Sequence, residues 1–137
     1  MDNQQKKILI VEDDQFLREF YQELLTAEGY FVDVAPDGEI ALSKLRSNEY
    51  NLVLLDLMLP KLNGIDVLKK IKKDPNTKNL SVIVLTNLDE DAIIKNALKL
   101  GANAYLVKID YTPQQIIDMV RQYIDFRQHL KKQKEII

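Results

Sequence analysis

Five short apolar runs recur along the chain, at residues 8–11, 30–34, 52–55, 82–85 and 104–107. Most of these runs are continuous rather than alternating with polar residues. Such runs are typical of strands that are buried on both faces of a sheet. We therefore predict five strands that lie inside the protein and are covered by other elements.

The stretches between these runs carry apolar residues at helical spacing, so each is expected to form a helix with one apolar face. The last helix is expected to start at Thr112, with Gln115 completing a capping box, and to continue through Tyr123. Gly29 and Gly101 follow helical patterns and suit the left-handed residue that ends a helix. The other expected apolar faces contain Phe16, Phe20, Leu24 and Ala27; Ala41, Leu42 and Leu45; Ile65, Leu68 and Ile71; and Ile93, Ile94, Ala97 and Leu98.

Strand and helix alternate five times, and parallel neighbouring strands need crossover helices. The pattern therefore predicts an α/β fold of three layers, in which helices cover both faces of a parallel sheet. At 137 residues the chain has no room for a separate output domain of any bulk. We predict one domain over residues 1–126, followed by a helical extension or tail over residues 127–137.

The composition excludes several classes of protein. With 19 Lys and Arg against 21 Asp and Glu, the net charge is -2, so no positive field would attract nucleic acid or anionic lipid. The absence of cysteine excludes disulfides, thiolate metal sites and cysteine nucleophiles. No apolar stretch approaches the roughly 20 residues of a membrane helix, and the polar start does not resemble a signal peptide. We expect a cytoplasmic protein that contacts neither nucleic acid nor membrane directly.

Polar side chains follow four of the predicted strands at the point where each strand ends. The carboxyl ends of parallel strands meet at one edge of the sheet, where such folds bind their ligands. Residues that are far apart in the sequence should therefore converge at this edge. These residues are Glu12, Asp13, Asp14, Asp56, Thr86 and Lys108.

Acidic groups that converge from two strands repel each other unless they share a cation. Carboxylates, a backbone carbonyl and waters suit Mg²⁺, and one histidine with no cysteine gives no indication of a softer metal. A carboxylate beside such an ion can attack a phosphoryl donor while a lysine neutralises the phosphoryl oxygens and a hydroxyl donates a hydrogen bond. Asp56, Lys108 and Thr86 match these three roles.

Two motifs carry a resemblance to a known family. The first is Ile-Leu-Ile-Val-Glu-Asp at residues 8–13, and the second is Leu-Leu-Asp-Leu-Met-Leu-Pro at residues 54–60, followed by Asn63 and Gly64. Over residues 6 to about 125 the chain resembles the receiver domain of two-component response regulators, in its single-domain, chemotaxis-type form. The resemblance implies the flavodoxin-like (βα)5 fold, with a five-stranded parallel sheet in the order 2-1-3-4-5.

The same resemblance implies a role for each acidic residue. Asp56 would be the phosphoacceptor and a metal ligand. Asp13 would bind the metal ion directly, Glu12 mainly through water, and Met58 only through its backbone carbonyl. Asp14 would start a helix rather than bind the ion. The implied cofactor is therefore Mg²⁺, with no further cofactor.

The resemblance also implies a switch. Thr86 would be the switch hydroxyl, Tyr105 the switch aromatic and Lys108 the phosphate-binding lysine. A histidine kinase or a phosphotransfer protein of a phosphorelay would donate to Asp56, and the inward move of Tyr105 would repack the surface of the fourth helix, fifth strand and fifth helix. A downstream effector would bind there. Such a domain catalyses its own phosphorylation and dephosphorylation without being a turnover enzyme.

Three positions depart from the family pattern or modify it. Ile109 stands where receivers usually have a proline in a cis bond, and a cis bond before Ile109 would cost about 2.5 to 4 kcal/mol. We therefore predict a trans bond, a rearranged turn and a weaker grip of Lys108 on phosphate. Asn87 stands where the family usually has a smaller residue, and Met58 lies two residues after Asp56. Both are hypothesised to change the lifetime of the phosphoryl group.

Apolar residues continue at heptad-like spacing beyond the predicted domain. This stripe is too short to establish a coiled coil. Three interpretations stay open, in this order: a frayed tail, a helix that forms a homodimer, and the start of a linker to an output domain. The stripe consists of Met119, Tyr123, Phe126, Leu130 and Ile137.

Three other functions compete with the receiver interpretation. A pseudo-receiver would keep the fold and bind partners without phosphorylation, and only Ile109 favours it. A flavodoxin-like cofactor binder would need a Ser/Thr/Gly-rich phosphate loop after the first strand, where this chain is acidic. A metal-dependent phosphatase with an aspartyl-phosphate intermediate would need a second acid at position 58, which is Met.

Overall fold

The predicted apolar runs form one parallel sheet in the computed structural model of the protein, which describes residues 5–136 and the side chains of residues 5–125. The strand order is β2-β1-β3-β4-β5, and every neighbouring pair is parallel. The predicted order 2-1-3-4-5 is therefore confirmed. The strands are β1 (Lys7–Val11), β2 (Phe31–Ala35), β3 (Leu52–Leu55), β4 (Ser81–Thr86) and β5 (Ala104–Val107).

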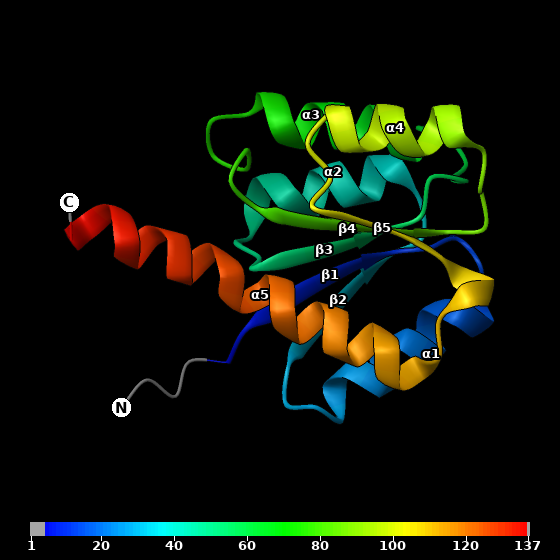
Figure 1. The fold of residues 1–137 in the computed structure, drawn as a ribbon. Helices are drawn as coiled ribbons and strands as arrows, with labels where there is room; N and C mark the ends of the chain where they lie inside the picture. Colours follow the sequence, from blue (N-terminus) through cyan, green and yellow to red (C-terminus); the bar gives the residue numbers. More distant parts are fainter. Residues whose placement is uncertain (1–4, 137) are drawn as a thin grey trace.

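Helices cover both faces of this sheet, as Figure 1 shows. α1 and α5 pack on the face to which Ile8 and Ile10 of β1 point, and α2, α3 and α4 pack on the face to which Leu9 and Val11 point. The three-layer (βα)5 flavodoxin-like fold is confirmed. The helices are α1 (Gln15–Thr26), α2 (Gly38–Ser47), α3 (Gly64–Lys73), α4 (Asp91–Lys99), the 3-10 helix η1 (Lys108–Asp110) and α5 (Pro113–Ile136).

The helix ends follow the predicted sequence signals. The carboxylate of Asp14 accepts a hydrogen bond of 3.0 Å from a backbone N–H in the first turn of α1, so Asp14 starts this helix as expected. At the start of α5, Thr112 Oγ1 accepts from the Gln115 N–H at 3.2 Å, and Gln115 Oε1 accepts from the Thr112 N–H at 2.8 Å. This is the predicted capping box. Gly29 and Gly101 have φ angles of 96° and 114°, in the left-handed region that glycine tolerates.

The expected apolar face of α1 is wrong in part. Phe16 is 76% exposed and Phe20 is 37% exposed, whereas Tyr21 and Leu25 are buried against the sheet. The residues of each pair are four positions apart, so helical spacing fits a stripe through Phe16 and Phe20 as well as one through Tyr21 and Leu25. The stripe that is buried is the second, which lies next to the first on the helix surface.

A charged cluster connects β2, α2 and the segment before β3. Asp33 accepts hydrogen bonds of 2.7 Å from Lys44 Nζ and from the Tyr50 hydroxyl, one on each carboxylate oxygen. Lys44 Nζ also donates to the carbonyl oxygen of Val34 at 2.6 Å. Burial alone would raise the pKa of Asp33, but the hydrogen bonds from Lys44 and Tyr50 outweigh it and lower this pKa. We call these residues the α2 cluster.

α5 is the longest helix and runs past the sheet at the left of Figure 1. It is tied to the start of β4 by the Ser81 hydroxyl, which donates to the carbonyl oxygen of Tyr123 at 3.0 Å. The predicted domain boundary after residue 126 stays a prediction. In the heptad-like stripe, the side chains of Phe126 and Leu130 lie outside the described side chains, and Ile137 lies outside the described residues.

Candidate functional site

Three carboxylates meet at the carboxyl edge of the sheet, where β1 and β3 end side by side. Val11 pairs in register with Leu55, so Glu12 and Asp56 leave the sheet together. The carboxylate oxygens of Glu12, Asp13 and Asp56 lie within 4.8 Å of one another. Glu12 and Asp56 are buried, whereas Asp13 lies at the surface. The structure therefore brings together the acidic residues that the sequence predicts for one site.

Lys108 reaches this acidic cluster from the end of β5. Its Nζ donates to Glu12 Oε1 at 2.5 Å and to Asp56 Oδ2 at 2.8 Å. The peptide bond before Ile109 is trans, as predicted, because no described residue has a cis peptide bond. The rearranged turn is the 3-10 helix η1. Lys108 contacts two carboxylates from this turn, and a weaker grip on phosphate stays a prediction.

Burial and charge shift the proton affinity of the buried groups. Burial raises the pKa of Glu12, and the neighbouring Asp56 adds to this, although the hydrogen bond from Lys108 opposes it. Burial alone would lower the pKa of Lys108, but its hydrogen bonds to Asp56 and Glu12 outweigh it and raise this pKa. Lys108 therefore keeps its charge at neutral pH. One ammonium group faces three carboxylates, which leaves an excess of negative charge that a divalent cation can compensate.

Backbone contacts fix the position of Asp56. Its N–H donates to the carbonyl oxygen of Val11 at 3.0 Å, and its Oδ1 accepts from the N–H of Met58 at 3.1 Å. The side chain of Met58 points out and is 56% exposed. α3 begins so close to this strand end that a Cβ on Gly64 would lie 2.4 Å from the carbonyl oxygen of Asp56. Only glycine fits there, which explains the Asn-Gly signal after the strand.

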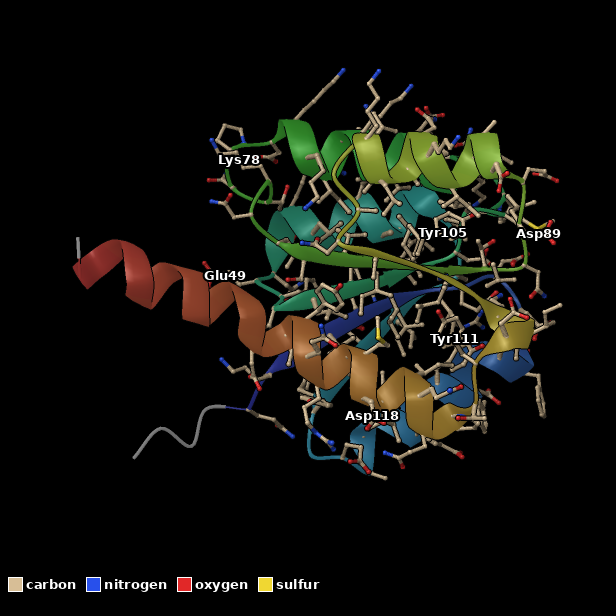
Figure 2. All side chains as sticks on the ribbon, viewed as in Figure 1. Glu49, Lys78, Asp89, Tyr105, Tyr111 and Asp118 are labelled. Atoms are coloured by element: carbon tan, nitrogen blue, oxygen red, sulfur yellow. The ribbon has the colours of Figure 1, made fainter. Side chains whose placement is uncertain are left out.

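Thr86 and Tyr105 both contact the loop between β4 and α4. Thr86 is fully buried, and its Oγ1 accepts a long hydrogen bond of 3.5 Å from the Leu88 N–H. The Tyr105 hydroxyl donates to the Leu88 carbonyl oxygen at 2.7 Å. Tyr105 lies on the α4 side of the sheet, as Figure 2 shows. Burial raises the pKa of Tyr105, with Glu90 adding to it, so the hydroxyl keeps the proton that it donates. Asn87, between Thr86 and Leu88, is exposed.

The arrangement suits a divalent metal ion and a phosphoryl group together. Carboxylate oxygens are the ligands that Mg²⁺ prefers in proteins. Within the described residues, Glu12, Asp13 and Asp56 are the one group of acidic or histidine side chains close enough to share an ion. Lys108 supplies a buried ammonium group and Thr86 a hydroxyl, which are the groups that bind phosphoryl oxygens.

The chain matches known proteins over most of its length. The family model of the response regulator receiver domain matches residues 8–121 of the chain. The chain belongs to the response regulator receiver family. This receiver is similar to the transcriptional regulatory protein CrdR of Helicobacter pylori, with 41% identity over 104 residues, which are 76% of the receiver and 48% of that protein. It spans about half the length of the curated relatives that it matches.

Solved receiver structures have the same fold. A CheY-like response regulator receiver domain protein from Methanospirillum hungatei aligns with a TM-score of 0.86 at 28% identity, covering 92% of this receiver and 98% of that chain. The receiver domain of a Francisella response regulator aligns with a TM-score of 0.80 at 31% identity, covering 88% and 97%. The predicted resemblance is therefore confirmed. The chain is a response regulator receiver domain of the kind found in two-component signalling systems. In the described part of the chain, every helix is too short or too polar to span a membrane.

Two features of this edge were not predicted from the sequence. Arg18 of α1 donates to the backbone carbonyl oxygens of Glu12 and Asp13. The only sequence signal for this contact is the position of Arg18, one helical turn after Asp14. The second feature is a set of exposed apolar side chains on three segments that leave the carboxyl edge, namely Phe16, Met58 and Ile109, which are 76%, 56% and 80% exposed.

Proposed function

We propose that the receiver accepts a phosphoryl group on Asp56 in a reaction that requires Mg²⁺, and that this modification changes a surface that binds a partner. One observation carries the proposal: Asp56 is a buried carboxylate with Lys108 Nζ 2.8 Å from one of its oxygens and two further carboxylates within 4.8 Å. These are the groups that a carboxylate needs to accept a phosphoryl group.

The proposed donor is the phosphohistidine of a histidine kinase or of a phosphotransfer protein. A carboxylate oxygen of Asp56 attacks the phosphorus, so that a P–O bond forms while the P–N bond breaks, and the imidazole takes up a proton as it leaves. Lys108 neutralises charge on the phosphoryl oxygens. Asp13, Asp56 and the carbonyl of Met58 would hold Mg²⁺, with Glu12 acting through water. When bound, the ion supplies further positive charge to the transition state.

The proposed switch uses the contacts around the loop after β4. The Thr86 hydroxyl turns toward the phosphoryl oxygens and gives up its long hydrogen bond to the Leu88 N–H. Tyr105 moves inward into the vacated space and releases the carbonyl of Leu88. This repacks the face of α4, β5 and α5, where a downstream effector binds. A difference of a few kcal/mol between the two arrangements is enough to shift the population.

The pseudo-receiver alternative is not favoured, because all five polar site residues of the family pattern are present. Several further expectations stay predictions: a single-domain protein in the cytoplasm, no contact with nucleic acid or membrane, and the homodimer among the interpretations of the last helix. The effects of Asn87 and Met58 on the lifetime of the phosphoryl group also stay hypotheses. Timing dephosphorylation of Asn87→Ala against the wild type tests the first of them.

The test of the proposed function is the intact mass of the protein after incubation with acetyl phosphate and Mg²⁺. We expect one added phosphoryl group in the wild type, no addition in Asp56→Asn, and no addition when a chelator removes Mg²⁺. Asp33→Asn is the matched control, because it removes a partly buried carboxylate away from the site. Addition to Asp56→Asn, or no addition to the wild type under any condition, would contradict the proposal and favour the pseudo-receiver.

A further inference from the structure

Arg18 holds the turn that carries the acidic pair. From α1, its Nη1 donates to the carbonyl oxygen of Glu12 at 3.0 Å and to the carbonyl oxygen of Asp13 at 3.1 Å. No other hydrogen bond to either carbonyl occurs within the described residues. One guanidinium nitrogen therefore fixes the two peptide planes on either side of the Asp13 Cα atom.

Asp13 differs from its two neighbours in how its carboxylate is held. Glu12 accepts from Lys108 and from the Asp14 N–H, and Asp56 accepts from Lys108 and from a backbone N–H. The carboxylate of Asp13 has no hydrogen-bond or ion-pair partner among the described residues, and Asp13 lies at the surface. The direction of this side chain therefore depends on the backbone of the turn.

We propose that Arg18 is a positioning residue for the metal ion, which acts by holding the backbone that aims Asp13 into the site. This inference rests on the Mg²⁺ site of the proposed function. Arg18 itself contacts no carboxylate of the cluster, because both of its described hydrogen bonds go to backbone carbonyl oxygens. Groups behind a metal ligand that fix its orientation commonly change metal affinity when they are removed.

The charge of Arg18 and its positioning role predict opposite effects on the metal ion. A nearby cation repels Mg²⁺, so loss of the charge alone would tighten Mg²⁺ binding. Loss of the two hydrogen bonds frees the turn, and Asp13 must then be ordered when the ion binds, which weakens binding. The sign of the change in affinity therefore distinguishes positioning from electrostatics.

The experiment is calorimetric titration of the full chain with MgCl₂ for the wild type, Arg18→Met and Arg18→Lys. We expect Arg18→Met to bind Mg²⁺ about 10-fold more weakly than the wild type. Arg18→Lys keeps the charge with a single donor group, so we expect an intermediate affinity. Arg121→Met is the matched control, because Arg121 contacts Glu28 and Asp118 rather than the acidic cluster, and its Mg²⁺ affinity should equal that of the wild type.

Asp13→Asn completes a double-mutant cycle. If Arg18 acts through Asp13, Arg18→Met should weaken Mg²⁺ binding much less in the Asp13→Asn background than in the wild type. If Arg18→Met folds and binds Mg²⁺ as tightly as the wild type or more tightly, the inference is wrong. If Arg18→Met does not fold, wild-type affinity in Arg18→Lys would overturn the inference instead. If the wild type itself binds no Mg²⁺, the metal site of the proposed function fails instead. Thermal melting in chelator separates a change in stability from a change in affinity.

Discussion

Lys44 and Lys108 both hold buried or partly buried carboxylates at hydrogen-bond distance, and the surroundings of these two lysines differ in charge balance. In the α2 cluster, Lys44 faces the single carboxylate of Asp33, whose second oxygen accepts from Tyr50. At the carboxyl edge, Lys108 faces Glu12 and Asp56, with Asp13 nearby. The α2 cluster is neutral, because one lysine balances one carboxylate. The acidic cluster keeps excess negative charge, and its carboxylate oxygens lie close enough together to share a cation.

The two clusters also shift the pKa values of their acids in opposite directions. Lys44 and Tyr50 lower the pKa of Asp33 against the effect of burial, whereas burial raises the pKa of Glu12 against the effect of Lys108. A lysine beside a carboxylate is therefore no evidence of function by itself. The ratio of carboxylates to cations separates a structural connection from a candidate binding site.

The largest expected effect is on the rate of phosphorylation, when Lys108 is replaced by methionine and compared with the same replacement of Lys44. Lys108→Met should slow phosphorylation by acetyl phosphate on the order of 100-fold, because one donor to the phosphoryl oxygens is lost. Lys44→Met should phosphorylate at the wild-type rate but lose about 1 kcal/mol of unfolding free energy with its partly exposed ion pair. Phosphorylation rates from intact mass and urea unfolding measure the two effects. Equal phosphorylation rates for both variants would contradict the functional difference between the two lysines.

Addition of Mg²⁺ should stabilise the protein only through the acidic cluster. Binding to the folded state alone adds about 2.7 kcal/mol to the unfolding free energy when free Mg²⁺ is 100 times its Kd. We expect this rise in the wild type and in Asp33→Asn, a much smaller rise in Asp13→Asn, which keeps the other two carboxylates, and no rise after chelation. Thermal unfolding with and without Mg²⁺ checks it. A rise of wild-type size in Asp13→Asn would mean that the ion binds elsewhere.

The smallest expected effect is the opposite pH dependence of the two acids, measured by urea unfolding in chelator. The lowered pKa of Asp33 adds stability above its ordinary value of 3.8, and this stability is lost as pH falls through the folded-state pKa. Asp33→Asn should therefore be less stable than the wild type at pH 7 and equal to it in acid.

Glu12 should behave in the opposite way. Its raised pKa means that the ionised carboxylate costs stability above its ordinary value of 4.5, and that this cost disappears as pH falls through the raised pKa toward 4.5. Glu12→Gln should therefore be more stable than the wild type at pH 7 without metal, and the difference should disappear in acid. The same slope for both variants would contradict the contrast between the clusters.

The parallel sheet could be predicted from the alternation of strands and helices, and its order from the family resemblance; the acidic site then follows from sequence position. Once residues 8–11 and 52–55 are parallel neighbours, Glu12 and Asp56 must leave the sheet at the same edge. Lys108 and Thr86 follow by the same rule. Their catalytic and switch roles are not fixed by position, so those roles remain proposals.

The parts that could not be predicted depend on the direction of side chains. Phe16 and Phe20 have the spacing of a buried stripe, yet the stripe of Tyr21 and Leu25 faces the sheet. The angle at which α1 leaves the turn decides between them, and apolar spacing does not encode that angle. The same angle brings Arg18 to the carbonyl oxygens, so a pattern of polar and apolar residues gives no indication of this contact.

The length of α5 would convert a small tilt at its start into a larger displacement of its far end. This helix begins a few residues after Lys108 at the carboxyl edge and continues for 24 residues to Ile136. At 1.5 Å per residue, it is about 36 Å long. A tilt of about 5° at its first turn would displace its far end by about 3 Å if the helix stays straight. A small rearrangement around Lys108 would thus become a movement that can be measured by the distance between two spin labels.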